Sequence, residues 1–512
     1  MKQKKEVRLH PALAFLILTL IIMIVSSIGG ILNLETSYYS VNAITGDLET
    51  QRITITNLFN RTGIQYLISN MLTNFINFAP LGNLIIGLLG VGVAYKSGFL
   101  NSLFKMISPK FPRKLITFLV VLIGVLSSMF YQVGYVIIIP LSAILFLNLG
   151  RHPSAGICAS FAGITFGYGA NIVVNGLDSI LLKYTKASAT ILDPSYKVHL
   201  LGNIFFTIIC TILIAYVGML ITEKYIIPKL GRYNFDEEDP DREHIVTKKE
   251  KKGVIISLLV TAILFIILIY CIIPGLPFSG LFLYLKDSLY VDQLFGENSY
   301  FSQGIVFITS AFLVISGLIY GLRVGTIKNS RDLVSGMNYY LKGFSSLLVL
   351  IFFAAQFCMI FKETNIGIFI VASLTELLSN LQLTGILLVI TCFLTIAIST
   401  VFVPAAGTKW AIIAPVMVPL FMQSSLTPEF ASAVFRAADS SIKGITPLFT
   451  YFVILIGFLQ IYDKRKNDTV TITDAMSLMV PYTIAMTILW FIVILGFYII
   501  GLPIGIKTGV TL

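Results

Sequence analysis

The sequence has few charged residues and long uncharged stretches. Only 12% of its 512 residues are Asp, Glu, Lys or Arg, whereas soluble globular chains have about a quarter. Apolar residues make up 56%, and uncharged runs long enough to cross about 30 Å of hydrocarbon recur along the chain. The first run, residues 11–34, is too long for a cleavable signal peptide and lacks a small-residue cleavage site. These features exclude a soluble fold and predict a polytopic, all-α membrane protein.

Residues that build metal sites and catalytic centres are also scarce. The four histidines are widely separated, and the five cysteines lie in or beside apolar runs without the paired spacing of metal ligands. HExxH, GxSxG and nucleotide-binding motifs are missing, which argues against an intramembrane hydrolase or a primary pump. The net charge of +11 comes from bases scattered through short loops, so it indicates membrane topology rather than a nucleic-acid partner. We expect no enzyme activity and no cofactor other than sodium ions.

The basic residues set the orientation of the chain in the plasma (inner) membrane. By the positive-inside rule, the N-terminus is placed in the cytoplasm by a group of bases: Lys2, Lys4, Lys5 and Arg8. Alternation then puts the polar segment 35–77 outside, the hydrophilic loop 224–252 in the cytoplasm and the C-terminus outside. An interfacial helix is expected at residues 364–381. The uninterrupted spans are expected at residues 11–34, 80–99, 197–222, 253–274, 303–322, 343–361 and 474–505.

Four other apolar stretches are interrupted by polar residues. Residues 115–150 and 383–424 have polar centres at Ser127–Tyr135 and Val403–Lys409, and we interpret each as a re-entrant hairpin. Lipid cannot satisfy the backbone of such a tip, so it must be buried in protein. For the first stretch, two ordinary spans joined by a tight turn are the alternative. Two spans are predicted to be broken by glycine, proline and polar residues: 153–183 and 436–461.

The order of span, hairpin, broken span and span occurs twice, entered from opposite sides of the membrane. This order is typical of an inverted repeat, which places a binding site near the midplane. The prediction is therefore about nine transmembrane helices plus two re-entrant hairpins. It divides the chain into four parts. Residues 1–79 form an N-terminal span with an external segment, and residues 80–222 form the first repeat. Residues 223–342 are expected to form the dimer scaffold, and residues 343–512 form the second repeat.

Five charged residues are predicted inside the membrane, where each costs roughly 2.5 to 3.5 kcal/mol and commonly lines a polar pathway. They are Asp178, Lys409, Arg436, Asp439 and Lys443. Arg436 and Asp439 are three residues apart and share a helix face, so they could pair, and a purely structural ion pair is one reading. Asp178 lies in the other repeat without a local basic partner, which favours a functional reading. An acid in each half with a base between them suits a proton or cation relay.

Polar and aromatic side chains cluster at the tips and breaks. Trp410 follows the second tip and is either an interfacial anchor or a platform for a ring-bearing substrate. Hydroxyls and carboxamides at these points could line a site whose unwound carbonyls bind sodium, or could simply solvate the breaks. They are Ser127, Ser128, Gln132, Asn171, Thr408, Ser440, Ser441 and Thr446.

Four stretches of the sequence carry a resemblance to a known family. They are Asn77–Gly82, Gly134–Pro140 continuing to Gly150–Pro153, Lys409–Pro415, and Arg436–Ser441 with Ile445–Pro447. In these stretches the chain resembles the p-aminobenzoyl-glutamate transporter (AbgT) family. The resemblance implies a homodimer in which each subunit has nine spans and two hairpins, and the functional residues Asp178, Trp410, Pro428, Arg436, Asp439 and Pro447.

The same resemblance implies a secondary active transporter driven by a proton or sodium gradient. Its substrates would be p-aminobenzoyl-glutamate or related aromatic carboxylates and sulfonamides, by uptake or by antimetabolite efflux. Arg436 would meet the anionic group, Trp410 the ring, and Asp178 with Asp439 would take protons or cations. A carrier of another small carboxylate or amino acid on the same fold is the alternative, since fold does not determine substrate.

The chain departs from the family pattern at three positions. Gln132 stands where an acid is expected in the first tip, Gly407 replaces a serine, and Lys443 replaces an asparagine. An ammonium at a helix break could occupy the place of a bound sodium ion. The resulting hypothesis is that the sodium site of the second repeat is lost or is served by Lys443.

Overall fold

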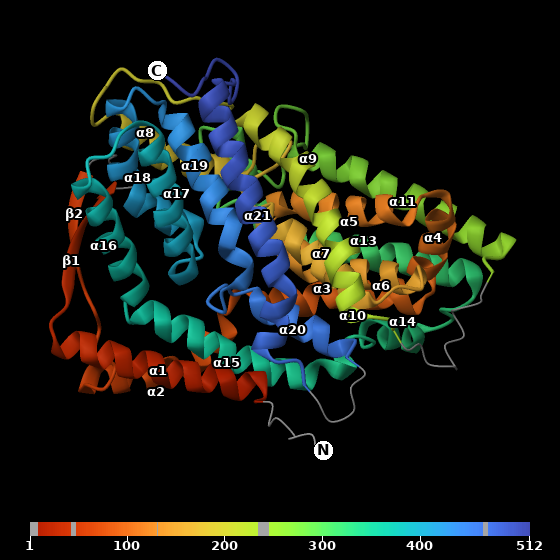
Figure 1. The fold of residues 1–512 in the computed structure, drawn as a ribbon. Coiled ribbons are helices and arrows are strands. Elements are labelled where there is room, and N and C mark those ends of the chain that lie inside the picture. The colour runs from red at the N-terminus through yellow and green to blue at the C-terminus, as the bar shows by residue number, and fades with distance from the viewer. Residues whose placement is uncertain (1–8, 42–47, 131, 234–244, 464–468) are drawn as a thin grey trace.

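The computed structural model describes residues 9–41, 48–130, 132–233, 245–463 and 469–512, and most of the chain in these ranges is helical (Figure 1). The same ranges contain nine helices that are long and apolar enough to cross a membrane. Nine spans were also predicted from the sequence, but they are not the same nine helices. The first helix of each hairpin is long enough to cross a membrane, whereas the segments of the two broken helices are too short. Several bases used to orient the chain, and one residue of the first tip, lie outside the described residues: Lys2, Lys4, Lys5, Arg8 and Tyr131.

The N-terminal part is more structured than its polar sequence suggested. A first helix, α1 (Pro11–Ile31), is followed by an antiparallel pair of strands, β1 (Glu35–Val41) and β2 (Leu48–Thr54), and then by α2 (Arg61–Ile76). The side chain of Asn60 starts α2 by accepting a hydrogen bond from the Gly63 N–H at 2.7 Å. The sequence described residues 35–77 only as a polar external segment, and the structure adds the strand pair and α2 to that description.

The first repeat contains a helical hairpin and an interrupted helix at the predicted places, and whether the hairpin is re-entrant stays a prediction. Its helices are α3 (Ala79–Lys96), α4 (Phe99–Ile107), α5 (Arg113–Ser127), α6 (Ile139–Asn148), α7 (Pro153–Phe166), α8 (Gly176–Ala189), α9 (Ile204–Ile221) and α10 (Ile227–Leu230). A short 3-10 turn and a π turn separate α5 from α6 at the hairpin tip. The predicted span 197–222 begins later than expected, because residues 197–203 are not helical and α9 begins at Ile204.

The middle of the chain and the second repeat supply the remaining helices. The middle part holds α11 (Lys248–Ile272), α12 (Tyr290–Phe295), α13 (Tyr300–Val324) and α14 (Ser330–Met337). The second repeat holds α15 (Phe344–Glu363), α16 (Ile366–Asn380), α17 (Gly385–Phe402), α18 (Ala406–Gln423), α19 (Pro428–Ile442), α20 (Phe452–Ile461) and α21 (Ile472–Ile500). The second broken helix thus begins at Pro428 and not at residue 436, because Thr427 caps it by accepting from the Phe430 N–H at 3.2 Å.

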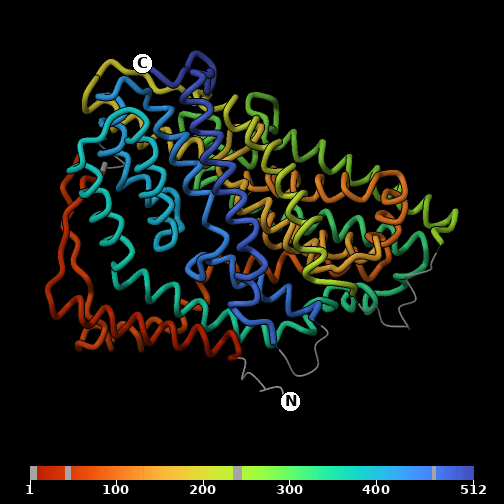
Figure 2. Tube along the Cα trace, in the orientation of Figure 1, coloured from red at the N-terminus to blue at the C-terminus, as the bar shows by residue number. Residues whose placement is uncertain are grey.

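The two broken helices occupy the interior of the molecule. All residues of α7 are buried, and so are all residues of α19 except the last. By contrast, α11 is largely exposed, and its outward apolar side chains suit contact with lipid. The two repeats are interleaved: α21, drawn in blue, runs beside α9 of the first repeat, and α18 packs against α8 (Figure 2). Residues of the two halves can therefore meet around α7 and α19.

Candidate functional site

The breaks of the two interrupted helices meet in the interior. The backbone N–H of Gly169, in the break between α7 and α8, donates to the Ser440 Oγ on α19 at 2.8 Å. A Cβ on Gly169 would lie only 2.7 Å from the Arg436 carbonyl oxygen. In the other break, a Cβ on Gly444 would lie 2.5 Å from the Phe166 ring. Glycine is therefore required on both sides of this crossing, which we call the break crossing (Gly167–Asn175 with Ile442–Tyr451).

An ion pair joins the two halves next to the break crossing. Asp178 is the third residue of α8, where its Oδ2 accepts from the Asn175 N–H at 2.7 Å in a capping box. Its Oδ1 accepts from the Arg436 Nη2 on α19. The side chains are 11% and 5% exposed, so water screens the pair little. Asp178 thus has a basic partner, and this partner comes from the other half of the chain.

Asp439 forms a separate cluster with two lysines. Its Oδ1 accepts from the Lys409 Nζ at 2.5 Å and its Oδ2 from the Lys443 Nζ at 2.9 Å. Lys409 also donates to the Thr400 Oγ1 at 2.5 Å and to the Val403 carbonyl at 3.1 Å. The suggestion that Arg436 pairs with Asp439 is therefore wrong. Both Asp439 oxygens are taken by lysines, and the Arg436 guanidinium reaches the first repeat instead.

Trp410 connects the second hairpin to the first repeat. Its Nε1 donates to the Thr185 Oγ1 on α8 at 3.0 Å, and its ring centroid lies 4.6 Å from that of Phe435 on α19. The side chain is fully buried. A tryptophan that anchors a protein at the membrane interface is exposed to lipid headgroups, so this burial argues against that role for Trp410. Whether the ring contacts a substrate stays a prediction.

The first hairpin tip opens onto a cavity beside the break crossing. This inner cavity has a volume of about 200 Å³ and is lined by residues of the tip, of the first break and of the middle part of the chain, including Ser128, Gln132, Tyr168, Leu177 and Phe295. It adjoins the first turn of α8, in which Asp178 lies. A small ligand in this cavity would therefore approach the ion pair from the side of the first repeat.

Several predicted polar residues bond within their own half. The hydroxyls of Ser127 and Ser441 donate to carbonyls three residues earlier, at Gly124 and Ala438. Asn171 donates to the Ser128 Oγ at 3.5 Å, and Thr446 donates to the Val401 carbonyl at 2.7 Å. These bonds satisfy backbone and side-chain groups at the tips and breaks, as the simpler interpretation proposed. The other predicted positions are spread along the second repeat: Gly407 and Thr408 are in the first turn of α18, Pro447 lies within the second break, and Pro428 begins α19 at the end away from that break.

Sequence reasoning missed Tyr168 as a site residue. Its ring lies 3.9 Å from the Lys443 Nζ, within the range of a cation–π contact, and it also lines the inner cavity. The available signal was an aromatic residue between two glycines in the middle of an apolar span, at Gly167–Gly169. Thr400 was also missed, because an isolated threonine on a helix usually bonds its own backbone.

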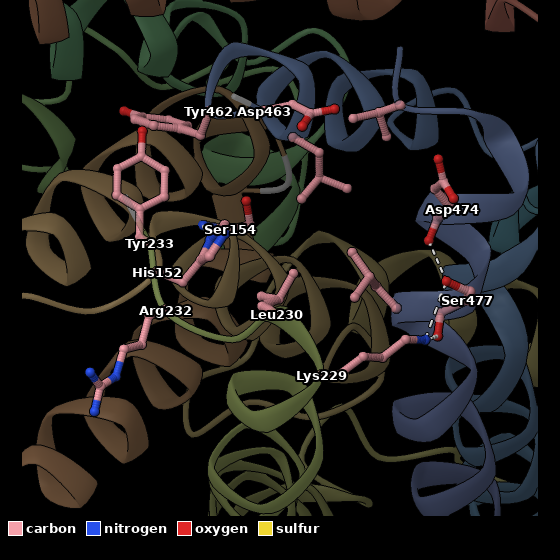
Figure 3. Close-up of a pocket in the computed structure, with 13 residues that line it drawn as sticks. His152, Ser154, Lys229, Leu230, Arg232, Tyr233, Tyr462, Asp463, Asp474 and Ser477 are labelled. Atoms are coloured by element: carbon pink, nitrogen blue, oxygen red, sulfur yellow. Dashed lines mark hydrogen bonds between the residues drawn. The ribbon is translucent and has the colours of Figure 1, made fainter. Parts of the chain in front are cut away.

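A larger cavity lies at the end of α7 that is away from its break. Its volume is about 490 Å³, and both halves of the chain contribute to it (Figure 3). His152 caps α7, its Nδ1 accepting from the Ser154 N–H at 3.2 Å, and its ring packs edge-on against Tyr233. Burial lowers the pKa of His152, and the charge of Asp463 opposes this shift. Across the cavity, Lys229 donates to the Ser477 carbonyl at 2.7 Å. In the predicted topology this cavity faces the cytoplasm.

Known transporters are similar in sequence to this chain over almost its whole length. The p-aminobenzoyl-glutamate transport protein of Escherichia coli (strain K12) is 30% identical over 496 residues, which cover 97% of this chain and 93% of that protein. The MtrF structure from Neisseria gonorrhoeae, described as illuminating a class of antimetabolite efflux pumps, is 32% identical, covers 98% of both chains and has a TM-score of 0.50.

The structure of the Alcanivorax borkumensis YdaH transporter is 29% identical, with coverage of 97% of this chain and 100% of that chain and a TM-score of 0.49. The profile of the AbgT putative transporter family matches residues 6–512. The match includes all four stretches on which the resemblance was based. The chain belongs to the AbgT family of membrane transporters.

Proposed function

We propose that this protein is a secondary active transporter of p-aminobenzoyl-glutamate or a related aromatic carboxylate or sulfonamide, driven by a proton or sodium gradient. The name of the Escherichia coli relative supports the substrate class, and the description of the Neisseria gonorrhoeae structure supports export as one possible direction. A carrier of another small carboxylate or amino acid is the alternative, because relatives at this identity can differ in substrate.

The observation that carries the proposal is that the Arg436 guanidinium uses only part of its hydrogen-bonding capacity. One of its terminal nitrogens bonds Asp178, while its Nε is buried and has no hydrogen-bond partner among the described residues. A guanidinium can hold a carboxylate through two parallel N–H donors. A substrate carboxylate can therefore bind the free Nε and compete with Asp178. Binding would then weaken the contact between the two halves of the chain.

The aromatic part of the substrate has a neighbouring surface. Phe435 precedes Arg436 on α19 and packs against Trp410 of the second hairpin. A substrate ring joined to the carboxylate would reach this pair once Trp410 turns away from Thr185 on α8. Aromatic pairs contribute about 0.5 to 1.5 kcal/mol beyond their buried area, which is enough to favour ring-bearing carboxylates.

Coupling requires that the ion pairs change partners as the site changes sides. Asp178 and Asp439 are the acids of the two halves, and each holds a base of the second repeat. In the proposal, a proton or a sodium ion enters the site when an acid and its basic partner separate. The orientation with a cytoplasmic N-terminus and an external C-terminus, and a homodimer formed through residues 223–342, belong to the same proposal. Cross-linking between cysteines introduced on α11 tests the dimer.

The decisive experiment is uptake of labelled p-aminobenzoyl-glutamate into proteoliposomes under imposed sodium or proton gradients. Accumulation is expected in the presence of one gradient, and it should be lost in the Asp178→Ala and Asp439→Ala variants. Unlabelled aromatic carboxylates should compete with the label more strongly than aliphatic amino acids do. If aliphatic substrates compete equally well, the alternative carrier function is correct. If nothing accumulates under either gradient, the proposed function is wrong.

A further inference from the structure

The cluster around Asp439 holds one more positive charge than it can neutralise. Lys409 comes from α18, Asp439 from α19 and Lys443 from the turn that follows α19. We propose that this lysine pair carries the coupling proton: one ammonium releases its proton in one state of the transport cycle and regains it in the other. This inference rests on the proposed function and names its coupling ion as a proton held on nitrogen.

The three charged side chains of the cluster are buried. The side chains of Lys409, Lys443 and Asp439 are 0%, 1% and 2% exposed. Two ammonium groups and one carboxylate leave a net charge of +1 in an interior that water does not reach. An unbalanced buried charge is costly, and loss of a proton from one ammonium removes the surplus charge. The two lysines together therefore favour a proton-exchanging unit.

Among the residues that the structure describes, no second carboxylate contacts either lysine. From the first break, Tyr168 presents its ring to Lys443, and from the first hairpin Tyr135 lies near the cluster and bonds Thr165. Arg436 and Asp178, one turn away, neutralise each other. From α17, Thr400 contributes a hydroxyl.

The geometry also argues against sodium at Asp439. A sodium ion binds to carboxylate and carbonyl oxygens, and here both carboxylate oxygens already accept from an ammonium, at 2.5 and 2.9 Å. The Val403 carbonyl at the second tip is likewise used by Lys409, at 3.1 Å. The ammonium groups thus stand where a metal cation would be held. A cation attached covalently to the chain cannot be carried across the membrane, but its proton can.

A path for the proton leads through Tyr168. The ring of Tyr168 covers the Lys443 ammonium on one side and lines the inner cavity on the other. When the ring moves, water in the cavity reaches the nitrogen. The N–H bond then breaks, the electron pair remains on nitrogen, and the proton passes to water. The cluster changes from a charge of +1 to neutral, and the reverse step restores it.

The test uses the full-length protein in proteoliposomes with a pH-sensitive dye inside. Exchange of labelled p-aminobenzoyl-glutamate at equal pH and without sodium gradients measures the proposed function alone. Accumulation under a pH gradient without sodium, together with the dye signal, tests whether transport is coupled to protons. We expect the unmodified protein to show all three. Accumulation that follows a sodium gradient and ignores the pH gradient would overturn the inference while leaving the proposed function in place.

The variant Lys443→Arg distinguishes two properties of Lys443: its ability to release a proton and its positive charge. Arginine keeps the positive charge but does not release its proton in proteins. We expect this variant to lose pH-driven accumulation and the dye signal out of proportion to any loss of exchange. The matched control is Lys186→Arg, an exposed lysine on α8, which should behave like the unmodified protein.

If Lys443→Arg shows no exchange, Lys443→Gln takes its place, because it removes the surplus charge and leaves Lys409 to neutralise Asp439. Its pH-driven accumulation should also fall further than its exchange. An undiminished ratio of accumulation to exchange in the variant that exchanges substrate contradicts the inference.

Discussion

The ion pair between Asp178 and Arg436 predicts a specific pattern of stability in a double-mutant cycle. Replacing Arg436 by Met leaves the Asp178 carboxylate buried without its partner, and replacing Asp178 by Leu leaves the guanidinium in the same position. Breaking a buried pair by removing one partner costs about 3 to 5 kcal/mol, whereas replacing both partners by apolar groups is close to neutral. The double variant should therefore be more stable than either single variant.

The structure gives the expected order of the variants. Exposures of 11% and 5% mean that solvent screening reduces the cost of each single replacement only slightly. Asp178 also accepts from the Asn175 N–H in the capping box of α8, and loss of a cap costs about 1 kcal/mol. Asp178→Leu should thus be less stable than Arg436→Met by about that amount. The double variant should retain only the loss of the cap.

The assay is the apparent melting temperature of purified protein in detergent, compared at one heating rate because unfolding of such proteins is commonly irreversible. The expected order is the unmodified protein, then the double variant, then Arg436→Met, then Asp178→Leu. All three variants should lack transport. Equal and additive decreases in the double variant would refute the claim that this pair joins the two halves.

Three further predictions concern single positions. Gly169→Ala should reduce transport about tenfold or more, since its Cβ would lie 2.7 Å from the Arg436 carbonyl and such overpacking costs about 1 to 3 kcal/mol. Gly82→Ala, whose Cβ would meet no atom within 4 Å, is the control. Trp410→Phe should lower stability by about 1 kcal/mol through loss of the 3.0 Å bond to Thr185. Because burial lowers the pKa of His152, its contribution to stability is complete above about pH 6.5 and is lost as the pH falls through the folded pKa. The melting temperature, followed from pH 8 to 5, should decrease less in His152→Asn, which keeps a capping group but does not titrate.

Each of these predictions has a result that would contradict it. Equal transport by the two glycine variants would show that the break crossing tolerates a side chain. An unchanged melting temperature in Trp410→Phe would mean that the indole N–H contributes nothing to the contact between α18 and α8. An identical pH profile in His152→Asn would show that this histidine does not titrate differently on folding.

The interrupted elements could be predicted from sequence because their cause is local. Glycine and polar residues within apolar runs lower helix propensity, and they predicted a break within residues 153–183, where the structure has a gap between Phe166 and Gly176. The start of α19 was missed although Thr427 and Pro428 give the usual signals of a helix N-terminus. The helix α2 was missed because its composition is polar enough to resemble an external loop.

The partners of the charged residues could not be predicted in the same way. Spacing along one helix suggested a pair between Arg436 and Asp439, but the actual partner of Arg436 is 258 residues away in sequence. Such a pairing depends on how the two halves are interleaved, and no local pattern contains this information. The same holds for the contact between Trp410 and Thr185, 225 residues apart.

Binding of the substrate carboxylate to Arg436 is tested most directly by two affinities of purified protein, one for p-aminobenzoyl-glutamate and one for its uncharged diamide. Both are measured in the unmodified protein and in Arg436→Met. Loss of a buried charge pair across a binding interface costs about 2 to 5 kcal/mol, or roughly 30-fold or more in affinity. We expect the acid to bind more tightly than the diamide only when Arg436 is present. Equal preference for the acid in both proteins would contradict the claim that the substrate carboxylate binds Arg436.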